Sequence, residues 1–322
     1  MKESSLPQAA GVKKSGGLSF GWFLAAVLVI LGVLYGPGLF KNGFRSKPRY
    51  FVVRQVLQFS GTETLGKPIF ANDIVAAGPD ELAITDNLNS QVLLFDFKGK
   101  LIRKWGKAGT KPLEFREPSS IATDRKGDLF VLDTWNSAVK EFDLNGKLLN
   151  SLDLTHFGFF YGPRRVGWGG DSLLVSNAAN NRLARISLKG ELINVWEGQK
   201  EMGGVSSAIM DGKGLYYVSA QDAQNNRVQV FDENGKMLRA IKTESPVEDL
   251  ALDSKGRLFA GGYGNPSNVY GPDGKWLGSL VDEAHMEKAI DQIMGIDIVA
   301  NDRIITCGGD FVTLYEIVGE KP

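Results

Sequence analysis

Apolar and polar residues alternate in short runs between about residues 50 and 320, and turns interrupt the runs. One turn motif returns six times: an apolar residue, a second residue that is Asp in three copies, two variable residues, Gly, and Lys or Glu. It reads FDFKGK at 95–100, FDLNGK at 142–147, ISLKGE at 186–191, FDENGK at 231–236, YGPDGK at 270–275 and YEIVGE at 315–320. The motif glycines are 47, 44, 45, 39 and 45 residues apart. This period indicates a protein built from repeated units that pack on their neighbours.

Each copy of the motif lies within a pattern of four strands. In the second unit, residues 119–143 alternate around two turns, and a short apolar strand, LLNSLD, follows the Gly-Lys pair. Four strands at a period of about 45 residues predict a β-propeller blade. The sixth unit supplies only three strands, whereas residues 50–59, YFVVRQVLQF, form a lone strand ahead of the first unit. We therefore expect an all-β, six-bladed β-propeller whose last blade is closed by the N-terminal strand.

The consensus of these units resembles that of NHL-repeat propellers. In the second unit it is matched by Pro118, Asp124, Gly127, Asp133, Asn136 and the segment 142–147, FDLNGK. The linker at 105–118, WGKAGTKPLEFREP, is also similar to the family's linker between blades. The resemblance covers roughly residues 50–320 and implies a six-bladed fold, but no particular activity, because the scaffold hosts many unrelated functions. Asn177, Gly262 and Gly308 depart from it, since they stand where the motif has Asp.

The first 49 residues differ from the rest in charge and hydropathy. They hold seven Lys or Arg and one acid, whereas residues 50–322 hold thirty bases and thirty-six acids. No residue between Lys14 and Lys41 is charged, and residues 18–40 exceed the ~20 that a membrane-spanning helix needs. A cleaved signal peptide is the alternative, but its apolar run is shorter and ends at a cleavage site. We expect a polar tail at 1–17, a transmembrane helix (signal anchor) at 18–40, a basic juxtamembrane linker at 41–49 and an NHL-type propeller at 50–320.

The charges on the two flanks of this span give opposite indications of orientation. The four bases at 41–49 outnumber those of the N-terminal tail, which favours a cytoplasmic propeller. A short tail with Lys13 and Lys14 directly before the apolar run is instead typical of an anchor that exports the following domain. We favour a periplasmic or extracellular propeller, with a cytoplasmic one as the alternative. In both cases the lipid bilayer is a partner through residues 18–40.

Aligning the six units places a pair of residues at the start of each innermost strand, around the central channel. The pairs are Asn72-Asp73, Ser119-Ser120, Arg164-Arg165, Ser206-Ser207, Glu248-Asp249 and Met294-Gly295. They differ from unit to unit, as a binding site requires. The candidate ligand-binding residues are Asn72, Asp73, Arg164, Arg165, Glu248 and Asp249. Their opposite charges can neutralise one another or bind a polar ligand, with Arg164 or Arg165 as an anion clamp.

Two insertions interrupt the rhythm of the repeat units. The segment 153–162 contains Phe157, Phe159, Phe160 and Tyr161, which form either core between blades or, if exposed, a partner-contact loop. Residues 282–293 have the apolar spacing of a short helix, on which we expect His285 to be exposed.

Asp86, Asp133 and Asn177 end the second strand of their units. We expect them to accept N–H groups of the following turn rather than to bind a cation.

Composition excludes several classes of site. One Cys, Cys307, and two His rule out a disulfide, a multi-cysteine zinc site and a three-histidine centre. The acidic balance of residues 50–322 argues against a nucleic-acid partner.

Gluconolactonase- and paraoxonase-type propellers, which share the general scaffold, use a channel calcium held by Glu, Asn and Asp. In this sequence Asn72, Asp73, Glu248 and Asp249 are the available oxygens, although the neighbouring arginines would repel a dication. We therefore expect no catalytic residues, no metal and no cofactor, in a membrane-anchored scaffold that binds a ligand or an unknown protein partner. A propeller hydrolase or lactonase with calcium in the channel is the alternative.

Overall fold

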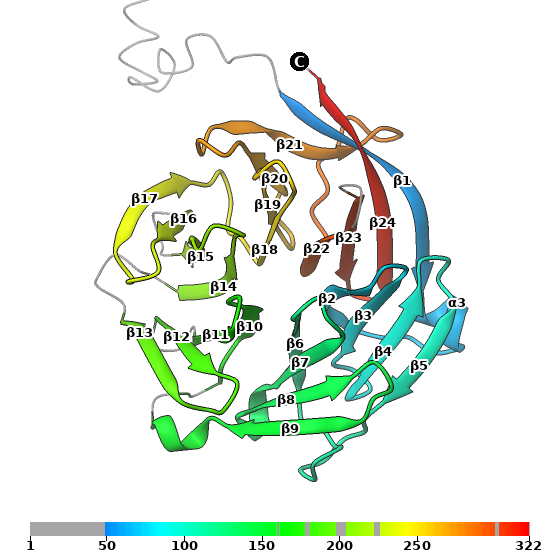
Figure 1. Cartoon of the computed structure of the whole chain (residues 1–322). Helices are drawn as coiled ribbons and strands as arrows, with labels where there is room; N and C mark the ends of the chain where they lie inside the picture. Colours follow the sequence, from blue (N-terminus) through cyan, green and yellow to red (C-terminus); the bar gives the residue numbers. More distant parts are fainter. Residues whose placement is uncertain are drawn as a thin grey trace, which may run out of the picture. The chain divides into compact units, whose positions relative to one another are not determined.

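The computed structural model describes residues 49–158, 160, 162–177, 181–197, 204–221, 226–299 and 303–321. Their strands form four separate four-stranded sheets and one eight-stranded sheet, arranged as a ring around a central channel (Figure 1). The eight-stranded sheet consists of two blades joined at their outer edges, so the ring has six blades. The all-β propeller predicted from the repeats is therefore confirmed.

In each of the first three blades, successive strands run from the channel outwards. Blade 1 contains β2 (Ala71–Gly78), β3 (Glu81–Asp86), β4 (Gln91–Asp96) and β5 (Leu101–Trp105). Blade 2 contains β6 (Pro118–Thr123), β7 (Asp128–Asp133), β8 (Ala138–Asp143) and β9 (Leu148–Asp153). Blade 3 contains β10 (Arg165–Trp168), β11 (Ser172–Asn177), β12 (Arg182–Ser187) and β13 (Leu192–Glu197).

The other three blades follow in chain order, again from the innermost strand outwards. Blade 4 contains β14 (Gly204–Met210), β15 (Tyr216–Gln221), β16 (Asn226–Phe231) and β17 (Met237–Lys242). Blade 5 contains β18 (Asp249–Leu252), β19 (Leu258–Gly261), β20 (Asn268–Tyr270) and β21 (Trp276–Asp282). Blade 6 contains β22 (Gly295–Val299), β23 (Arg303–Gly308), β24 (Phe311–Lys321) and β1 (Tyr50–Ser60).

The two ends of the propeller meet in blade 6. Strand β1 pairs antiparallel with β24 along its whole length, from Tyr50 opposite Lys321 to Ser60 opposite Phe311. This is the closure that the lone N-terminal strand suggested. The first four residues of β1 also pair in parallel with β21 of blade 5, from Tyr50 opposite Ser279 to Val53 opposite Asp282. The same strand thus covers the edges of two blades, which leaves neither edge open to another chain.

The recurring turn motif has a local physical cause. Asp96 Oδ1 accepts the backbone N–H groups of Lys98 and Lys100 at 2.9 and 2.8 Å, which fixes the turn between β4 and β5. Gly99 has a φ of 80°, a conformation that side chains with a Cβ rarely adopt. A Cβ on Gly99 would also lie 2.9 Å from the ring of Phe59, which belongs to the preceding blade. The Asp therefore shapes the turn, and the Gly lets it pack on its neighbour.

The core lies between the blades rather than inside any one of them. The described residues form six buried apolar clusters, and each joins the faces of two adjacent blades. For example, Val75 and Leu94 of blade 1 pack with Ile121, Val131 and Phe142 of blade 2. Because one blade cannot bury its own faces, the ring must close to complete the core.

Two sequence expectations have different outcomes in the structure. Residues 282–293 do not form the expected helix but consist of turns, with isolated bridges between Val281 and Ala289 and between Tyr263 and Gln292. These bridges tie the segment to blade 5, so its apolar residues contact the sheet without a helical face. His285 is exposed there, as expected.

No helix of the described residues is long and apolar enough to span a membrane, and the predicted span at 18–40 lies outside those residues.

We predict that Gly99→Ala lowers the free energy of unfolding by about 1–2 kcal/mol, because the residue keeps a positive φ and meets Phe59. Chemical denaturation of the full-length protein would measure the change. Gly212→Ala is the matched control, since Gly212 has open space around it and no positive φ, and it should change the stability little. Equal stability of the two variants would contradict the proposed role of the motif.

Candidate functional site

The predicted polar pairs surround the channel in two stacked rings. The ladder of β2 with β3 skips Asn72, and that of β6 with β7 skips Ser119, so both strands have a β-bulge at the pair. A bulge breaks the alternation of a strand, which lets two consecutive side chains reach the channel. The first ring contains Asn72, Ser119, Arg164, Ser206, Glu248 and Met294. The second ring contains Asp73, Ser120, Arg165, Ser207, Asp249 and Gly295.

Arg165 of blade 3 crosses the second ring and binds three other blades. Its Nη1 lies 2.9 Å from Asp73 Oδ2 and 3.8 Å from Asp249 Oδ2. On the other side, Nε donates to the Glu248 carbonyl at 3.0 Å, and Nη2 donates to the Met294 carbonyl. The side chain is only 6% exposed. The guanidinium therefore links blade 3 to three other blades across the channel, and Arg165 also lines the cavity next to the first ring.

The two carboxylates of the second ring also bind adjacent blades. Asp73 Oδ2 accepts the Ser120 hydroxyl at 2.5 Å and the Ile121 N–H at 3.0 Å. Asp249 Oδ2 accepts the Ile296 N–H at 3.0 Å, and its Oδ1 accepts the Ser207 hydroxyl at 2.7 Å. The second ring is thus a polar belt that links the inner strands around the channel.

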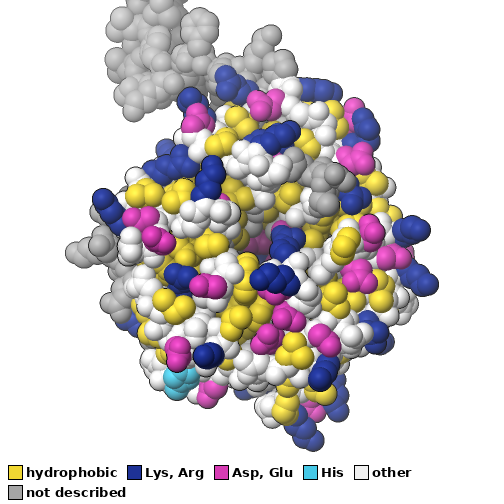
Figure 2. All heavy atoms as spheres, in the orientation of Figure 1, with side chains coloured by type: hydrophobic (Ala, Val, Ile, Leu, Met, Phe, Trp, Pro, Cys, Tyr) yellow, Lys and Arg dark blue, Asp and Glu magenta, His cyan; other side chains and the backbone are white. Residues whose placement is uncertain are grey.

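The first ring continues these links nearer to solvent. Asn72 Nδ2 donates to the Ser119 carbonyl, and Arg164 Nε donates to the Ser206 hydroxyl at 3.2 Å. Arg164 also pairs with Glu248 at 2.5 Å, while its side chain remains 48% exposed. Figure 2 shows the centre of the ring as a hollow with acidic and basic side chains around it. The first ring is therefore the more accessible of the two.

Burial perturbs the ionisable groups of the second ring. It raises the pKa of Asp249 to about 7, because Arg165 offsets the loss of hydration only in part and Asp73 adds a like charge. The pKa of Arg165 is raised, because Asp249 and Asp73 outweigh the effect of burial, which alone would lower it. The pKa of Cys307, which faces the same groups, is raised by burial. Two carboxylates thus share one fixed cation in a buried layer.

The first ring lines the polar mouth, a cavity of about 260 Å³ whose walls include Asn72, Asn87, Glu117, Trp135, Arg164 and Glu248. Two buried acceptors on these walls, Asn87 Oδ1 and Glu117 Oε2, have no donor among the described residues. Trp135 is 60% exposed. The pKa of Glu117, on the same walls, is raised by burial and by the charge of Asp133, and Trp135 lowers it in part. The polar mouth therefore combines an exposed aromatic ring with acceptors that lack partners.

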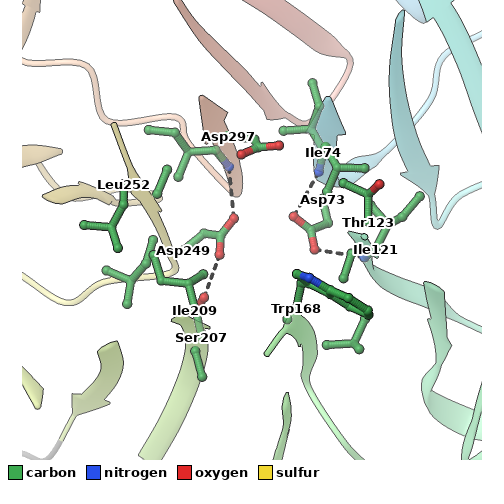
Figure 3. A pocket seen from close by; sticks show the side chains of 18 of the residues that line it. Asp73, Ile74, Ile121, Thr123, Trp168, Ser207, Ile209, Asp249, Leu252 and Asp297 are labelled. Carbon is green, nitrogen blue, oxygen red and sulfur yellow. Dashed lines mark hydrogen bonds between the residues drawn. The ribbon is translucent and has the colours of Figure 1, made fainter. Parts of the chain in front are cut away.

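Beyond the second ring lies a second cavity of about 260 Å³, which is named the apolar funnel after the apolar residues on its walls. Its walls include Val75, Ile121, Trp168, Ile209, Met210 and Leu252, which follow the polar pairs on the inner strands. Figure 3 shows the carboxylates of Asp73 and Asp249 facing each other across this cavity. Because the polar pairs lie at or near the start of each inner strand, the polar mouth and the apolar funnel lie at opposite ends of the channel.

The six candidate residues surround one channel, but they do not form one ligand-binding cluster. Four of them, Asn72, Arg164, Arg165 and Glu248, line the polar mouth, whereas Asp73 and Asp249 line the apolar funnel. Arg164 and Arg165 are both paired with carboxylates, which does not favour an anion clamp. The described residues contain no group of three or more His, Cys, Asp or Glu that could hold a metal. Mutual neutralisation, one of the two expectations for these charges, is what the geometry shows.

Asp86 and Asp133, which end the second strands of blades 1 and 2, accept N–H groups from the entry of their blades. Asp86 Oδ1 also accepts the N–H group of Asn89 in the following turn at 3.3 Å, as expected. Asp133 Oδ1 accepts the N–H groups of Arg116 and Glu117 at 2.9 and 3.1 Å, and these donors precede the blade. Asp133 Oδ2 binds the buried Lys140 ammonium at 2.8 Å. Asp86 Oδ1 likewise accepts the Phe70 N–H at 3.0 Å. These carboxylates fasten the entry of a blade to its second strand.

The aromatic segment between blades 2 and 3 contributes to the core where it is described. Phe160 is 7% exposed and belongs to the cluster between those blades. Phe157 is half-buried and packs edge-on against Phe160, with ring centroids 5.9 Å apart. Phe159 and Tyr161 lie outside the described residues. Phe157 and Phe160 therefore fit the expectation of core packing between blades better than that of an exposed partner-contact loop.

Sequence reasoning missed Asn87, Glu117 and Trp135 in the polar mouth. Asn87 and Trp135 occupy variable positions in the turn after the second strand, and Glu117 precedes the first strand. An exposed Trp at a variable position of a turn was the available signal. It also missed Trp168, Arg125 and Asp297 of the apolar funnel. Trp168 and Asp297 lie on inner strands, where sequence alone does not separate channel from core, and Arg125 lies in the turn after β6.

Comparisons with known proteins agree with this fold. Residues 72–161, which span the first two blades, match the model of a family described as a 6-bladed beta-propeller, DUF5128. The β-propeller domain of Cps50 (Swd1) from Myceliophteria thermophila is similar, with a TM-score of 0.58 and 13% identity, over 83% of this chain and 100% of that chain. The WD40 propeller of Doa1 has a TM-score of 0.57 and 12% identity, over 82% and 97% of the two chains.

An enzyme of the same fold is also similar. A catalytically inactive variant of virginiamycin B lyase from Staphylococcus aureus, with quinupristin, has a TM-score of 0.57 and 12% identity, over 76% of this chain and 80% of that chain. At such identities these likenesses show a shared fold and not a shared function.

We predict that Arg165→Met destabilises the protein by about 3–5 kcal/mol, because it leaves two buried carboxylates without their cation. Arg164→Met is the matched control, since its ion pair is half-exposed and should contribute less than about 1 kcal/mol. Denaturant unfolding of both variants checks this difference. Similar losses would mean that the second ring does not hold the blades together.

We also predict that stability falls as the pH rises from 5 to 8. The folded protein keeps the Asp249 proton up to about pH 7, whereas an unfolded Asp loses it near pH 4. Stability from this group is therefore highest at the acid end of the window and declines until Asp249 is ionised in both states. Melting temperatures of wild type and Asp249→Asn across this range test the idea. The variant should show the smaller decline, and parallel curves would exclude Asp249 as the cause.

Proposed function

We propose that this chain is a single-pass membrane protein whose NHL-type propeller is a binding scaffold, and that the polar mouth holds its protein partner or polar ligand. Residues 18–40 form the anchor in this proposal, and the propeller faces the periplasm or the cell exterior. The uncharged run between Lys14 and Lys41 supports the anchor. The excess of acids over bases in residues 50–322 supports a partner other than nucleic acid.

The polar mouth carries this proposal because two of its acceptors lack donors among the described residues. A buried acceptor without a donor costs about 1–3 kcal/mol, and a bound partner that supplies N–H or O–H groups would remove the cost. Asn87 Oδ1 and Glu117 Oε2 come from different blades but line the same cavity. Trp135 stands beside them, and exposed Trp side chains are frequent anchors of binding interfaces.

A calcium-dependent hydrolase or lactonase fits the geometry less well. Asp73 and Asp249 would have to be ligands, but the guanidinium of Arg165 already lies between them. A dication there would meet a fixed positive charge at short range. The virginiamycin B lyase shows that a propeller can be an enzyme, and the likeness to it extends to the fold alone. Binding without a metal or cofactor is therefore the function that these residues support best.

We predict that Trp135→Ala and Glu117→Gln each reduce capture of a partner at least fivefold. The full-length tagged protein would be crosslinked in intact cells, and the adduct isolated from carbonate-washed membranes and quantified. Leu238→Ala is the matched control, because Leu238 is 50% exposed on β17, away from the channel. It should leave the adduct unchanged.

Two outcomes would contradict the proposal. The first is an adduct that both polar-mouth variants retain. The second is a rise in melting temperature on addition of calcium that Glu248→Ala abolishes, because this would favour the metal-dependent alternative.

A further inference from the structure

The apolar funnel is a second cavity to which the proposed function assigns no role. The apolar part of its walls is formed by Val75, Ile121, Trp168, Ile209, Met210 and Leu252. Thr123, Arg125, Ser207 and Asp297 are polar residues of the same walls, and Asp73 and Asp249 line the cavity as well. The Trp168 ring stacks on the ring of Phe130, with 5.5 Å between the ring centroids and an angle of 18° between the planes. This contact holds the Trp168 side chain in place. A cavity of about 260 Å³ holds roughly nine water-sized groups at about 30 Å³ each. The space therefore suits a small organic molecule.

The floor of the apolar funnel is negatively charged. Asp73 and Asp249 face each other across it (Figure 3). Arg165 is the cation between them. Arg165 lies much closer to Asp73, at 2.9 Å, than to Asp249, at 3.8 Å. The other partners of Asp249, the Ser207 hydroxyl and the Ile296 N–H, are neutral. When both carboxylates are ionised, one negative charge thus lacks a full counter-charge.

The rim of the apolar funnel does not alter this balance. Arg125 and Asp297 line it and form an ion pair at 2.6 Å. Asp297 also accepts the Ala76 N–H at 2.8 Å from the neighbouring blade, which keeps it in place. Because these two charges cancel, the floor determines the charge of the cavity. Anions are therefore disfavoured, and a cation with an apolar body is complementary to both walls and floor.

We propose that the apolar funnel binds a small apolar amine, with its protonated amino group against Asp249 and Asp73 and its hydrocarbon part against Trp168, Ile209 and Leu252. The ammonium supplies the charge that the second ring lacks and donates to carboxylate lone pairs that Arg165 leaves free. The apolar part removes wall surface from water. This site is separate from the polar mouth, since Arg165 lies between them.

The proposal is tested with 2-phenylethylamine as the probe and the full-length protein at pH 8, where Asp249 is ionised. The charged or titratable groups around Asp249 are Asp73, Arg165 and Cys307, and the thiol of Cys307 stays protonated because its pKa is raised. Calorimetry should show saturable binding of the amine. The neutral 2-phenylethanol should bind at least tenfold more weakly, and the anionic 3-phenylpropionate should not bind measurably.

Three variants test whether the amine binds in the apolar funnel. Asp249→Asn keeps the shape of the side chain and should weaken the amine at least tenfold while leaving 2-phenylethanol unchanged. Ile209→Trp fills the cavity and should abolish binding of both, which keeps the test valid if Asp249→Asn does not fold. Trp135→Ala in the polar mouth should leave amine binding unchanged, whether or not it affects partner capture.

Three results would overturn the proposal. These are equal affinity for the amine and the alcohol, amine binding that neither Asp249→Asn nor Ile209→Trp weakens, and no binding of the amine at all.

Discussion

The buried guanidinium of Arg165 is the interaction on which the centre of this propeller depends. One side chain from blade 3 binds carboxylates of blades 1 and 5 and carbonyl groups of blades 5 and 6. The apolar clusters of the described residues hold each blade to its two neighbours, but they provide no contact across the channel. Arg165 supplies that contact. The same carboxylates hold hydroxyl and N–H groups of adjacent blades, so the charges that close the ring also fix its polar belt.

This arrangement gives the two ends of the channel different chemistry. The second ring separates a polar mouth, where acceptors lack donors beside an exposed Trp135, from an apolar funnel with a negative floor. Among the residues that the structure describes, the arginines that line the two ends, Arg125, Arg164 and Arg165, already lie beside carboxylates. Asn87 Oδ1 and Glu117 Oε2 in the polar mouth have no donor, and Asp249 in the apolar funnel is 3.8 Å from its nearest cation. A partner at either end is therefore expected to supply hydrogen-bond donors or positive charge. The acidic balance of residues 50–322 agrees with this expectation.

The fold was more predictable than the site, for reasons that particular residues show. The Asp and Gly of the turn motif act locally, so Asp96 and Gly99 are recognisable in a single sequence, and their period predicts the blades. The helix expected at 282–293 was wrong, because the apolar residues of that segment contact blade 5 through two isolated bridges. Pairing of β1 with β21 was not expected either, since it depends on how two blades approach each other.

The sequence by itself determined the repeat, the number of blades and the residues that begin each inner strand, because these depend on local turn chemistry and on alternation along a strand. Only the tertiary structure decided which of those residues share a cavity. Bulges at Asn72 and Ser119 bring consecutive side chains to the channel, and so one sequence pair contributes to two rings. Whether Arg165 binds a ligand or the protein itself depends on distances to blades that are more than eighty residues away in the chain, and alternation along one strand carries no information about such distances.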